Sequence, residues 1–164
     1  MLKNLYYLKI TSLLFKYSST FNDVKMIDIT PKKSLYRKAI ARSTLKLNYE
    51  SFSKLQGNTL IKGNAIVVAK SAGIMAAKNT SNILTLCHNI PLDFINIKIE
   101  FNVSTTEVYI ESEVKSFAKT GVEMEALIAC SVASLSLYDM CKNISKENYI
   151  QDISLINKTK NDFF

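Results

Sequence analysis

The stretch LDFINIKIEFNVSTTEVYIESEVKSF, residues 92–117, decides the fold class, because two runs within it alternate apolar and polar residues with a period of two. In the first run one face carries Ile95, Ile97, Ile99 and Phe101; in the second, Val108, Ile110 and Val114 lie opposite Glu107, Glu111 and Glu113. A short polar turn joins the two runs. The stretch therefore predicts an antiparallel β-hairpin with one buried face.

Helical patterns lie on both sides of this hairpin. One helix is expected to begin at Asn64, a suitable N-cap, and to continue through Ala77, and a longer one to cover residues 121–144. A short helix over residues 48–56, ended by Gly57, and strands over residues 36–47 and 149–157 complete the prediction. Strands interleaved with two long helices indicate one α+β domain, an antiparallel sheet with the helices packed on one face.

The long helix carries a stripe of mostly small side chains. Its members recur at spacings of three and four and so share one face: Ala126, Ala129, Ala133, Ser136 and Met140. Small side chains allow another backbone to come close. Two partners fit this stripe, the chain's own sheet and a second subunit, and the sequence does not choose between them.

Both ends of the same helix are charged. Glu123 and Glu125 lie in the first turn, where the helix dipole favours acids. Asp139 lies near the last turn, where the dipole and apolar neighbours are expected to raise its pKa, as an acid–base catalyst requires, whereas Lys142 would lower it in a plain salt bridge. Glu125 and Asp139 are separated by roughly 21 Å of helix, too far for one compact ligand. They serve different pockets, or one pocket that a neighbouring subunit completes, which favours an oligomer.

The composition limits the kinds of partner. The net charge of +7 favours anions, but no basic stripe interleaved with aromatic residues appears, and the acids of the hairpin oppose RNA binding. A small phosphorylated molecule is the better expectation. Three cysteines without CxxC spacing and a single histidine argue against a disulfide framework and a structural metal site.

The first 24 residues differ from the remainder of the chain. They contain three lysines among apolar and hydroxyl residues and no acid before Asp23. We expect a transit peptide or a disordered extension over residues 1–24 and the folded domain over residues 25–164. A transit peptide would direct the protein to the mitochondrial matrix or another organelle, and without one the protein is expected in the cytoplasm. Lys9 interrupts the apolar run, so no membrane segment is expected there.

Other polar residues are individually ambiguous. Cys87 and His88 are neighbours that point to opposite sides of an extended chain, which disfavours a Cys–His dyad, and His88 suits either a structural role or a contact with phosphate. Lys62 precedes a glycine at a helix start, a weak signal for an anion site. Arg37, Lys78 and Lys158 taken singly are expected to be solvated surface charges.

Three quoted segments together resemble one family. AGIMAAKNTSNILTLCHNIPL (residues 72–92), KTGVEMEALIACSVASLSLYDMCK (residues 119–142) and MIDIT (residues 26–30) are similar to cyclic pyranopterin monophosphate synthases of molybdenum cofactor biosynthesis. The resemblance extends over about residues 26–158. It implies a ferredoxin-like fold, a homohexamer built as a trimer of dimers, and sites between subunits.

The resemblance also implies a reaction. Family members convert (8S)-3',8-cyclo-7,8-dihydroguanosine 5'-triphosphate to cyclic pyranopterin monophosphate and release pyrophosphate. No redox cofactor is implied, and a divalent metal with the phosphates is possible but not indicated. No nucleic acid or membrane partner is implied. The alternative is a catalytically silent oligomeric nucleotide-binding protein of the same fold.

Site residues follow from the same resemblance, position by position. Asp139, Lys142 and Lys62 match catalytic positions, and the substrate-binding positions are matched by Leu86, Cys87, His88, Glu123, Met124, Glu125, Arg37, Lys78 and Lys158. Three departures stand out. Asn89 replaces a usual proline, Asn79 replaces a usual arginine, and the Gly-rich, lysine-containing tail is reduced to KTKNDFF, residues 158–164. The last two remove positive charge or an anion-binding segment, which is expected to weaken substrate binding.

Overall fold

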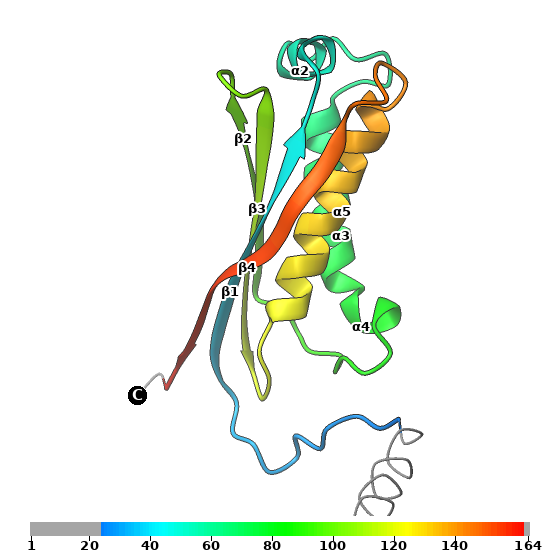
Figure 1. The fold of residues 1–164 in the computed structure, drawn as a ribbon. Helices are drawn as coiled ribbons and strands as arrows, with labels where there is room; N and C mark the ends of the chain where they lie inside the picture. The colour runs from blue at the N-terminus through cyan, green and yellow to red at the C-terminus, as the bar shows by residue number, and fades with distance from the viewer. Residues whose placement is uncertain (1–23, 163–164) are drawn as a thin grey trace, which may run out of the picture.

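The computed structural model describes residues 24–162, which form a four-stranded antiparallel sheet with two long helices packed on one face (Figure 1). The elements are β1 (Leu35–Lys46), α2 (Tyr49–Gln56), α3 (Ala65–Lys78), α4 (Thr80–Ile83), β2 (Phe94–Asn102), β3 (Glu107–Ala118), α5 (Glu123–Cys141) and β4 (Tyr149–Asn161). The strand order is β2-β3-β1-β4, and each neighbouring pair is antiparallel. Apart from the short helices α2 and α4, this β-α-β-β-α-β order is that of a ferredoxin-like fold. The predicted fold class is confirmed.

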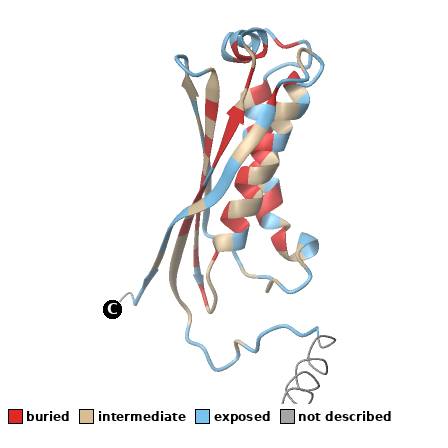
Figure 2. Ribbon diagram, in the orientation of Figure 1, coloured by how far each residue is buried: buried red, intermediate tan, exposed pale blue. Residues whose placement is uncertain are grey.

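The β2–β3 hairpin has the faces expected from its alternation. Ile97 lies opposite Ser112 in the register and is 2% exposed. Val108, Ile110 and Val114 are fully buried. The buried positions run down the strands on the side of the sheet that α3 and α5 cover (Figure 2). The period-two pattern was therefore sufficient to assign the inner face of the hairpin.

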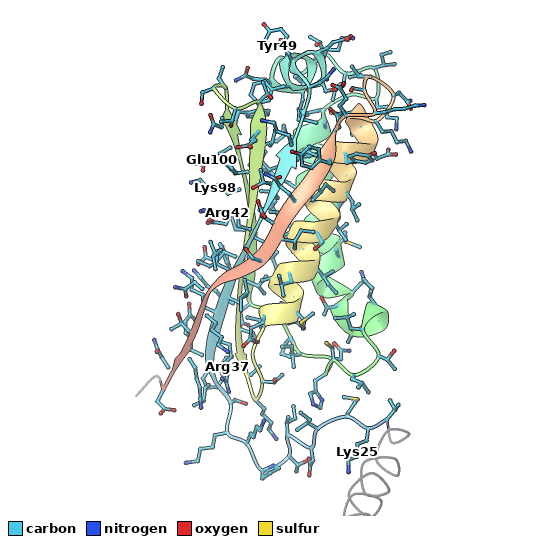
Figure 3. All side chains as sticks on the ribbon, viewed as in Figure 1. Lys25, Arg37, Arg42, Tyr49, Lys98 and Glu100 are labelled. Atoms are coloured by element: carbon cyan, nitrogen blue, oxygen red, sulfur yellow. The ribbon has the colours of Figure 1, made fainter. Side chains whose placement is uncertain are left out.

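The other face of the sheet is covered by no helix within residues 24–162 and carries charged side chains. Figure 3 shows Arg42, Lys98 and Glu100 pointing away from the helices. Ion pairs join β1 to β3 across this face, with 2.7 Å from Lys38 Nζ to Glu113 Oε1 and 2.7 Å from Arg42 Nη2 to Glu111 Oε2. Because acids and bases alternate there, this face is not the basic platform that single-stranded nucleic acid requires.

The small-residue stripe of α5 packs mainly on the other long helix. A Cβ placed on Gly73 of α3 would lie 2.9 Å from the carbonyl oxygen of Ala129 and 3.2 Å from Cβ of Ala133. At Gly73 the backbone of α3 therefore lies directly against the Ala129 carbonyl and the Ala133 side chain of α5. The sequence prediction named the sheet and a second subunit as partners but not α3, because spacing along one helix does not show which element faces it. The stripe also reaches the sheet at Ala126, and contact with a second subunit stays a prediction.

A neighbouring stripe of α5 faces the sheet instead. Cys130 and Ser134 are fully buried, and the Cys130 thiol contacts Ser43 Oγ of β1 at 3.3 Å, while the Ser43 and Ser134 hydroxyls form a hydrogen bond. Ser112 of β3 donates to the carbonyl oxygen of Ala126 at 2.6 Å. Small polar side chains therefore connect α5 to two strands, and each has its partner inside the core.

The ends of α5 lie inside the predicted limits. The helix covers residues 123–141 and not 121–144, because Val122 offers no side-chain cap and Lys142 closes the last turn. By length and mean hydropathy α5 could cross a membrane. Its apolar composition is explained by its packing between α3 and the sheet, where Ala126, Ala129 and Leu137 are fully buried. The prediction for α3 is confirmed at its start, where the Asn64 side chain accepts from the Val67 amide at 3.1 Å.

Candidate active site

The predicted site residues lie in two groups at opposite ends of α5. One group surrounds the first turn of the helix, near the end of the molecule where Figure 3 shows Lys25 and Arg37. The other surrounds the last turn, close to α2, whose first residue is Tyr49 (Figures 1 and 3). The helix between Glu125 and Asp139 measures roughly 21 Å. A single chain therefore does not bring the two groups together.

The first group lines a pocket of about 270 Å³. Six predicted substrate-binding residues meet there, three from the segment after α4 and three from the first turn of α5: Leu86, Cys87, His88, Glu123, Met124 and Glu125. The remaining wall had not been predicted as part of a site: Lys25, Ile27, Ile29, Lys32, Thr120 and Gly121. Two family segments were available signals for this wall: MIDIT contains Ile27 and Ile29, and the segment of residues 119–142 contains Thr120 and Gly121. At these four positions they had been used only as marks of the family.

Two acid groups in this pocket have shifted pKa values. Burial raises the pKa of Glu125, which is 5% exposed, and the neighbouring Glu123 raises it further. Burial and the charge of Glu125 also raise the pKa of the Cys87 thiol above its usual 9.0. Cys87 is accordingly a thiol and not a thiolate at neutral pH, which makes it a weak nucleophile. The pocket suits recognition of a polar ring more than attack by sulfur.

The raised pKa of Glu125 predicts a pH-dependent effect of the substitution Glu125→Gln. Below the ordinary carboxyl pKa of 4.5 the acid is neutral in both states. Above it, the unfolded chain ionises first, so burial of Glu125 destabilises the fold increasingly as pH rises through the folded-state pKa. Calorimetry should therefore find a higher unfolding midpoint for Glu125→Gln near pH 8 and no difference near pH 4, with Glu147→Gln, an exposed site, as control. An equal gain at both pH values would contradict this explanation.

A second pocket of about 210 Å³ adjoins the first and shares Gly121 and Glu123 with it. Its other lining residues are largely basic: Arg37, Lys38, Val122, Lys158, Thr159 and Lys160. Arg37 donates from its guanidinium to the carbonyl oxygens of Ala118 and Lys119, both at 3.4 Å. Arg37 and Lys158 were predicted around phosphates, whereas Lys38 and Lys160 were not. Two basic strands beside a helix N-terminus form a suitable anion site.

Lys78 lies apart from this basic pocket. It is the last residue of α3, it is exposed, and it lines neither pocket. In a single chain Lys78 therefore does not join the basic residues of the second pocket, and its role around the phosphates stays a prediction.

The second group consists of Asp139 held between two lysines. Lys142 Nζ lies 2.7 Å from Oδ1 of Asp139, and Lys62 Nζ lies 2.7 Å from Oδ2 and 3.1 Å from the Asp139 carbonyl oxygen. Lys62 comes from the loop between α2 and α3, just before Gly63, whose φ is +96°. The three predicted catalytic residues therefore meet.

Of the two alternatives left open for Asp139, the structure supports the salt bridge with Lys142, and a raised pKa is excluded. Hydrogen bonds from Lys142 and Lys62 lower the pKa of this carboxyl to about 2. The side chain is also about half exposed, so the apolar neighbours named in the sequence do not desolvate it. Conversely, Asp139 raises the pKa of Lys142. The group is thus a carboxylate with two ammonium partners at neutral pH.

No three His, Cys, Asp or Glu side chains within residues 24–162 lie close enough together to hold a metal ion. The sequence did not indicate a divalent metal with the phosphates, and that expectation stays a prediction.

Comparison with known proteins places these residues in a family context. The model of the MoaC family matches residues 26–161, a range that contains each predicted site residue. A probable cyclic pyranopterin monophosphate synthase of Saccharolobus solfataricus is 42% identical over 146 residues, covering 85% of this chain and 97% of that protein. Cyclic pyranopterin monophosphate synthases of Heliobacterium modesticaldum (42% over 135 residues, 82% and 85% of the two chains) and Listeria monocytogenes serotype 4a (44% over 142 residues, 85% and 88%) are similar to it as well.

Proposed function

Because this chain belongs to the MoaC family and is an enzyme of molybdenum cofactor biosynthesis, a cyclic pyranopterin monophosphate synthase like its relatives, we propose that it converts (8S)-3',8-cyclo-7,8-dihydroguanosine 5'-triphosphate to cyclic pyranopterin monophosphate with release of pyrophosphate. The family resemblance predicted from the sequence is confirmed. The substrate and the mechanism are our proposal, and the three-residue group at Asp139 is the observation that carries the mechanism.

The two adjoining pockets support the proposed substrate. The first combines apolar side chains with the buried carboxyl of Glu125 and the imidazole of His88, a lining that suits a polar bicyclic ring. The second presents Arg37, Lys38, Lys158 and Lys160, a lining that suits a triphosphate. Since the pockets share Gly121 and Glu123, one nucleotide-like molecule can occupy both. Lys158 Nζ, 3.7 Å from Glu123 Oε1, offsets the one acid on the shared wall.

The group at the last turn of α5 supports acid–base chemistry. With a pKa of about 2, Asp139 is ionised at neutral pH and is not the proton donor. Lys142 and Lys62 carry the protons. The Asp139 carboxylate accepts hydrogen bonds from the two ammonium groups and orients them during opening of the purine-derived ring. As the cyclic phosphate forms and pyrophosphate leaves, the basic residues of the second pocket stabilise the charge on the phosphate oxygens.

The separation of the two groups supports a site completed by another subunit. Roughly 21 Å of helix lies between Glu125 and Asp139, so the last turn of one chain must meet the pockets of another for both to contact one substrate. We propose a homo-oligomer on this ground. A hexamer arranged as a trimer of dimers is the form that the family resemblance implies.

Location is a separate proposal. The predicted transit peptide falls on residues 1–24, of which all but Val24 lie outside the described part of the chain. Import into the mitochondrial matrix or another organelle stays a prediction, as does the domain boundary at residue 25. The relatives are archaeal and bacterial, a distribution that agrees with the cytoplasmic alternative.

The proposed reaction is tested by measuring pyrophosphate release from the cyclic dihydroguanosine triphosphate by residues 25–164, with GTP as the matched control. We expect release from the cyclised substrate and none from GTP, since GTP lacks the second bond between ribose and base, from C3' to C8, that defines the cyclised substrate. No release from folded, oligomeric protein that binds the substrate in calorimetry would favour the catalytically silent nucleotide-binding protein. Release from both compounds would indicate an unspecific pyrophosphatase.

A further inference from the structure

Asn148 is a buried asparagine at the junction of three elements. It ends the connection between α5 and β4, and only 3% of its surface is exposed. A buried amide requires hydrogen-bond partners for its donors and its acceptor. Its surroundings supply these partners, so the position of Asn148 is fixed by contacts in the protein interior.

The three contacts of Asn148 reach two helices. Its Oδ1 accepts from the Asn48 amide at 3.0 Å, and its Nδ2 donates to Ser51 Oγ at 3.0 Å and, at a longer 3.4 Å, to the carbonyl oxygen of Cys141. Asn48 is the N-cap of α2 and Ser51 lies in its first turn, whereas Cys141 is the last residue of α5. Ser51 and Cys141 are fully buried. The amide thus joins the start of α2 to the end of α5.

These two attachment points carry the three residues of the Asp139 group. On the α5 side, Cys141 lies between Asp139 and Lys142 in the chain. On the α2 side, the loop that bears Lys62 is hydrogen-bonded back onto α2, with Thr59 N donating to the Lys54 carbonyl at 2.9 Å. Lys62 therefore moves with α2, and Asp139 and Lys142 move with the end of α5.

The ion pairs of the group do not fix this arrangement by themselves. The side chains of Lys62, Asp139 and Lys142 are 41%, 51% and 50% exposed. Exposed ion pairs are screened by solvent and hold their geometry weakly. The contacts of Asn148 with Ser51 and Cys141 are buried, and satisfied buried hydrogen-bond networks specify one arrangement. The spacing of the group is thus set beneath the surface.

We propose that Asn148 is a positioning residue that fixes Lys62 of the α2 side against the Asp139–Lys142 pair of the α5 side. The proposal rests on the proposed catalytic role of that group. Asn148 contacts none of the three side chains directly and acts through the Cys141 carbonyl, the Asn48 amide and the Ser51 hydroxyl.

Site-resolved acetylation of lysines tests the positioning without any need for activity. In Asn148→Ala, Lys62 is expected to react about threefold faster with a mild acetylating reagent, because its amine is no longer held 2.7 Å from the Asp139 carboxylate and meets the reagent more often. Lys98, paired with Glu100 at 2.6 Å on the remote sheet face, is expected to react at an unchanged rate and serves as internal reference. Asp139→Asn gives the rate of Lys62 without its ion pair, with the contact to the backbone carbonyl of residue 139 retained. Peptide mass spectrometry reads each lysine separately.

The matched control is Ser112→Ala, which removes another buried hydrogen bond to α5, the one to the Ala126 carbonyl. If Lys62 reacts no faster in Asn148→Ala, or equally faster in Ser112→Ala, the proposal is overturned. Should Asn148→Ala not fold, Ser51→Ala removes the 3.0 Å contact alone and is expected to give a smaller acceleration at Lys62. An unchanged Lys62 in a folded Ser51→Ala would then overturn it.

Kinetics separate this proposal from the proposed function. Asn148→Ala is expected to lower kcat about tenfold with little change in KM, because misplacing a catalytic group affects the reacting geometry more than binding. Faster acetylation of Lys62 with unchanged kcat would support the positioning and contradict a catalytic role of Lys62. A lower kcat without faster acetylation would contradict the positioning alone.

Discussion

Lys142→Ala lowers kcat for pyrophosphate release by roughly 10²–10⁴-fold, the usual range for loss of a proton-transfer group. The reason is the position of its ammonium, 2.7 Å from Asp139 and in a group whose carboxylate is ionised with a pKa of about 2. Since Asp139 is not a proton donor at neutral pH, the proposed mechanism assigns this role to its lysine partners. Lys62 keeps its own contacts with Asp139 in this variant, so the fold at the end of α5 is retained.

Lys54→Ala is the matched control. Lys54 also pairs with an acid on a helix, Glu50, at 2.7 Å, and its side chain is 46% exposed against 50% for Lys142. Both variants lose one exposed ion pair, so their unfolding midpoints should change by the same small amount. Only Lys142→Ala should lose activity. Retained activity in Lys142→Ala, or equal losses in both variants, would contradict the assignment.

Gly73→Val destabilises the folded chain by about 3 kcal/mol, the upper part of the range for overpacking a core. A single Cβ at this position already meets the Ala129 carbonyl oxygen at 2.9 Å and Ile97 Cδ1 at 3.1 Å. The backbone oxygen cannot rotate away, so α3 and α5 must separate. A gain in helix propensity of up to about 1 kcal/mol over glycine offsets part of this cost. Thermal unfolding should shift downward by roughly 10 °C.

Ser71→Val on the exposed side of α3 is the control for this substitution. It introduces the same β-branched side chain into the same helix without touching α5, and its effect should remain within about 0.5 kcal/mol. If Gly73→Val unfolds at the temperature of Ser71→Val, the close contact of the two helices does not contribute to stability.

The fold was predictable to the extent that its signals are local. The alternation in residues 92–117 fixed the inner face of the hairpin, and Asn64 fixed the start of α3 through its side chain. The ends of α5 were predicted two and three residues too far out, because no capping side chain marks them. The partner of its small-residue stripe depended on Gly73, which lies 56 residues before Ala129 and shares no pattern with it.

The membership of the site was predictable from the family motifs, whereas the pKa of Asp139 stayed between two alternatives. The hydrogen bond from Lys142, which the sequence had offered, lowers this pKa most, and the further contribution of Lys62 could not be foreseen because that residue lies 77 residues away in the chain. Lys25, Lys32, Lys38 and Lys160 were missed for the same reason, since each joins its pocket only through the folding of distant segments. Charge alone made them appear to be ordinary surface lysines.

The burial of the three cysteines also determines how the protein tolerates oxidants. Burial raises the pKa of Cys87, of Cys130 and, to about 11, of Cys141. Peroxides and alkylating reagents attack thiolates, and with a pKa above 9.0 fewer than about one such thiol in a hundred is ionised at pH 7. A pocket that contains a cysteine would ordinarily be vulnerable to oxidative inactivation. The raised pKa values therefore predict that these thiols react slowly with peroxides and alkylating reagents in the folded protein.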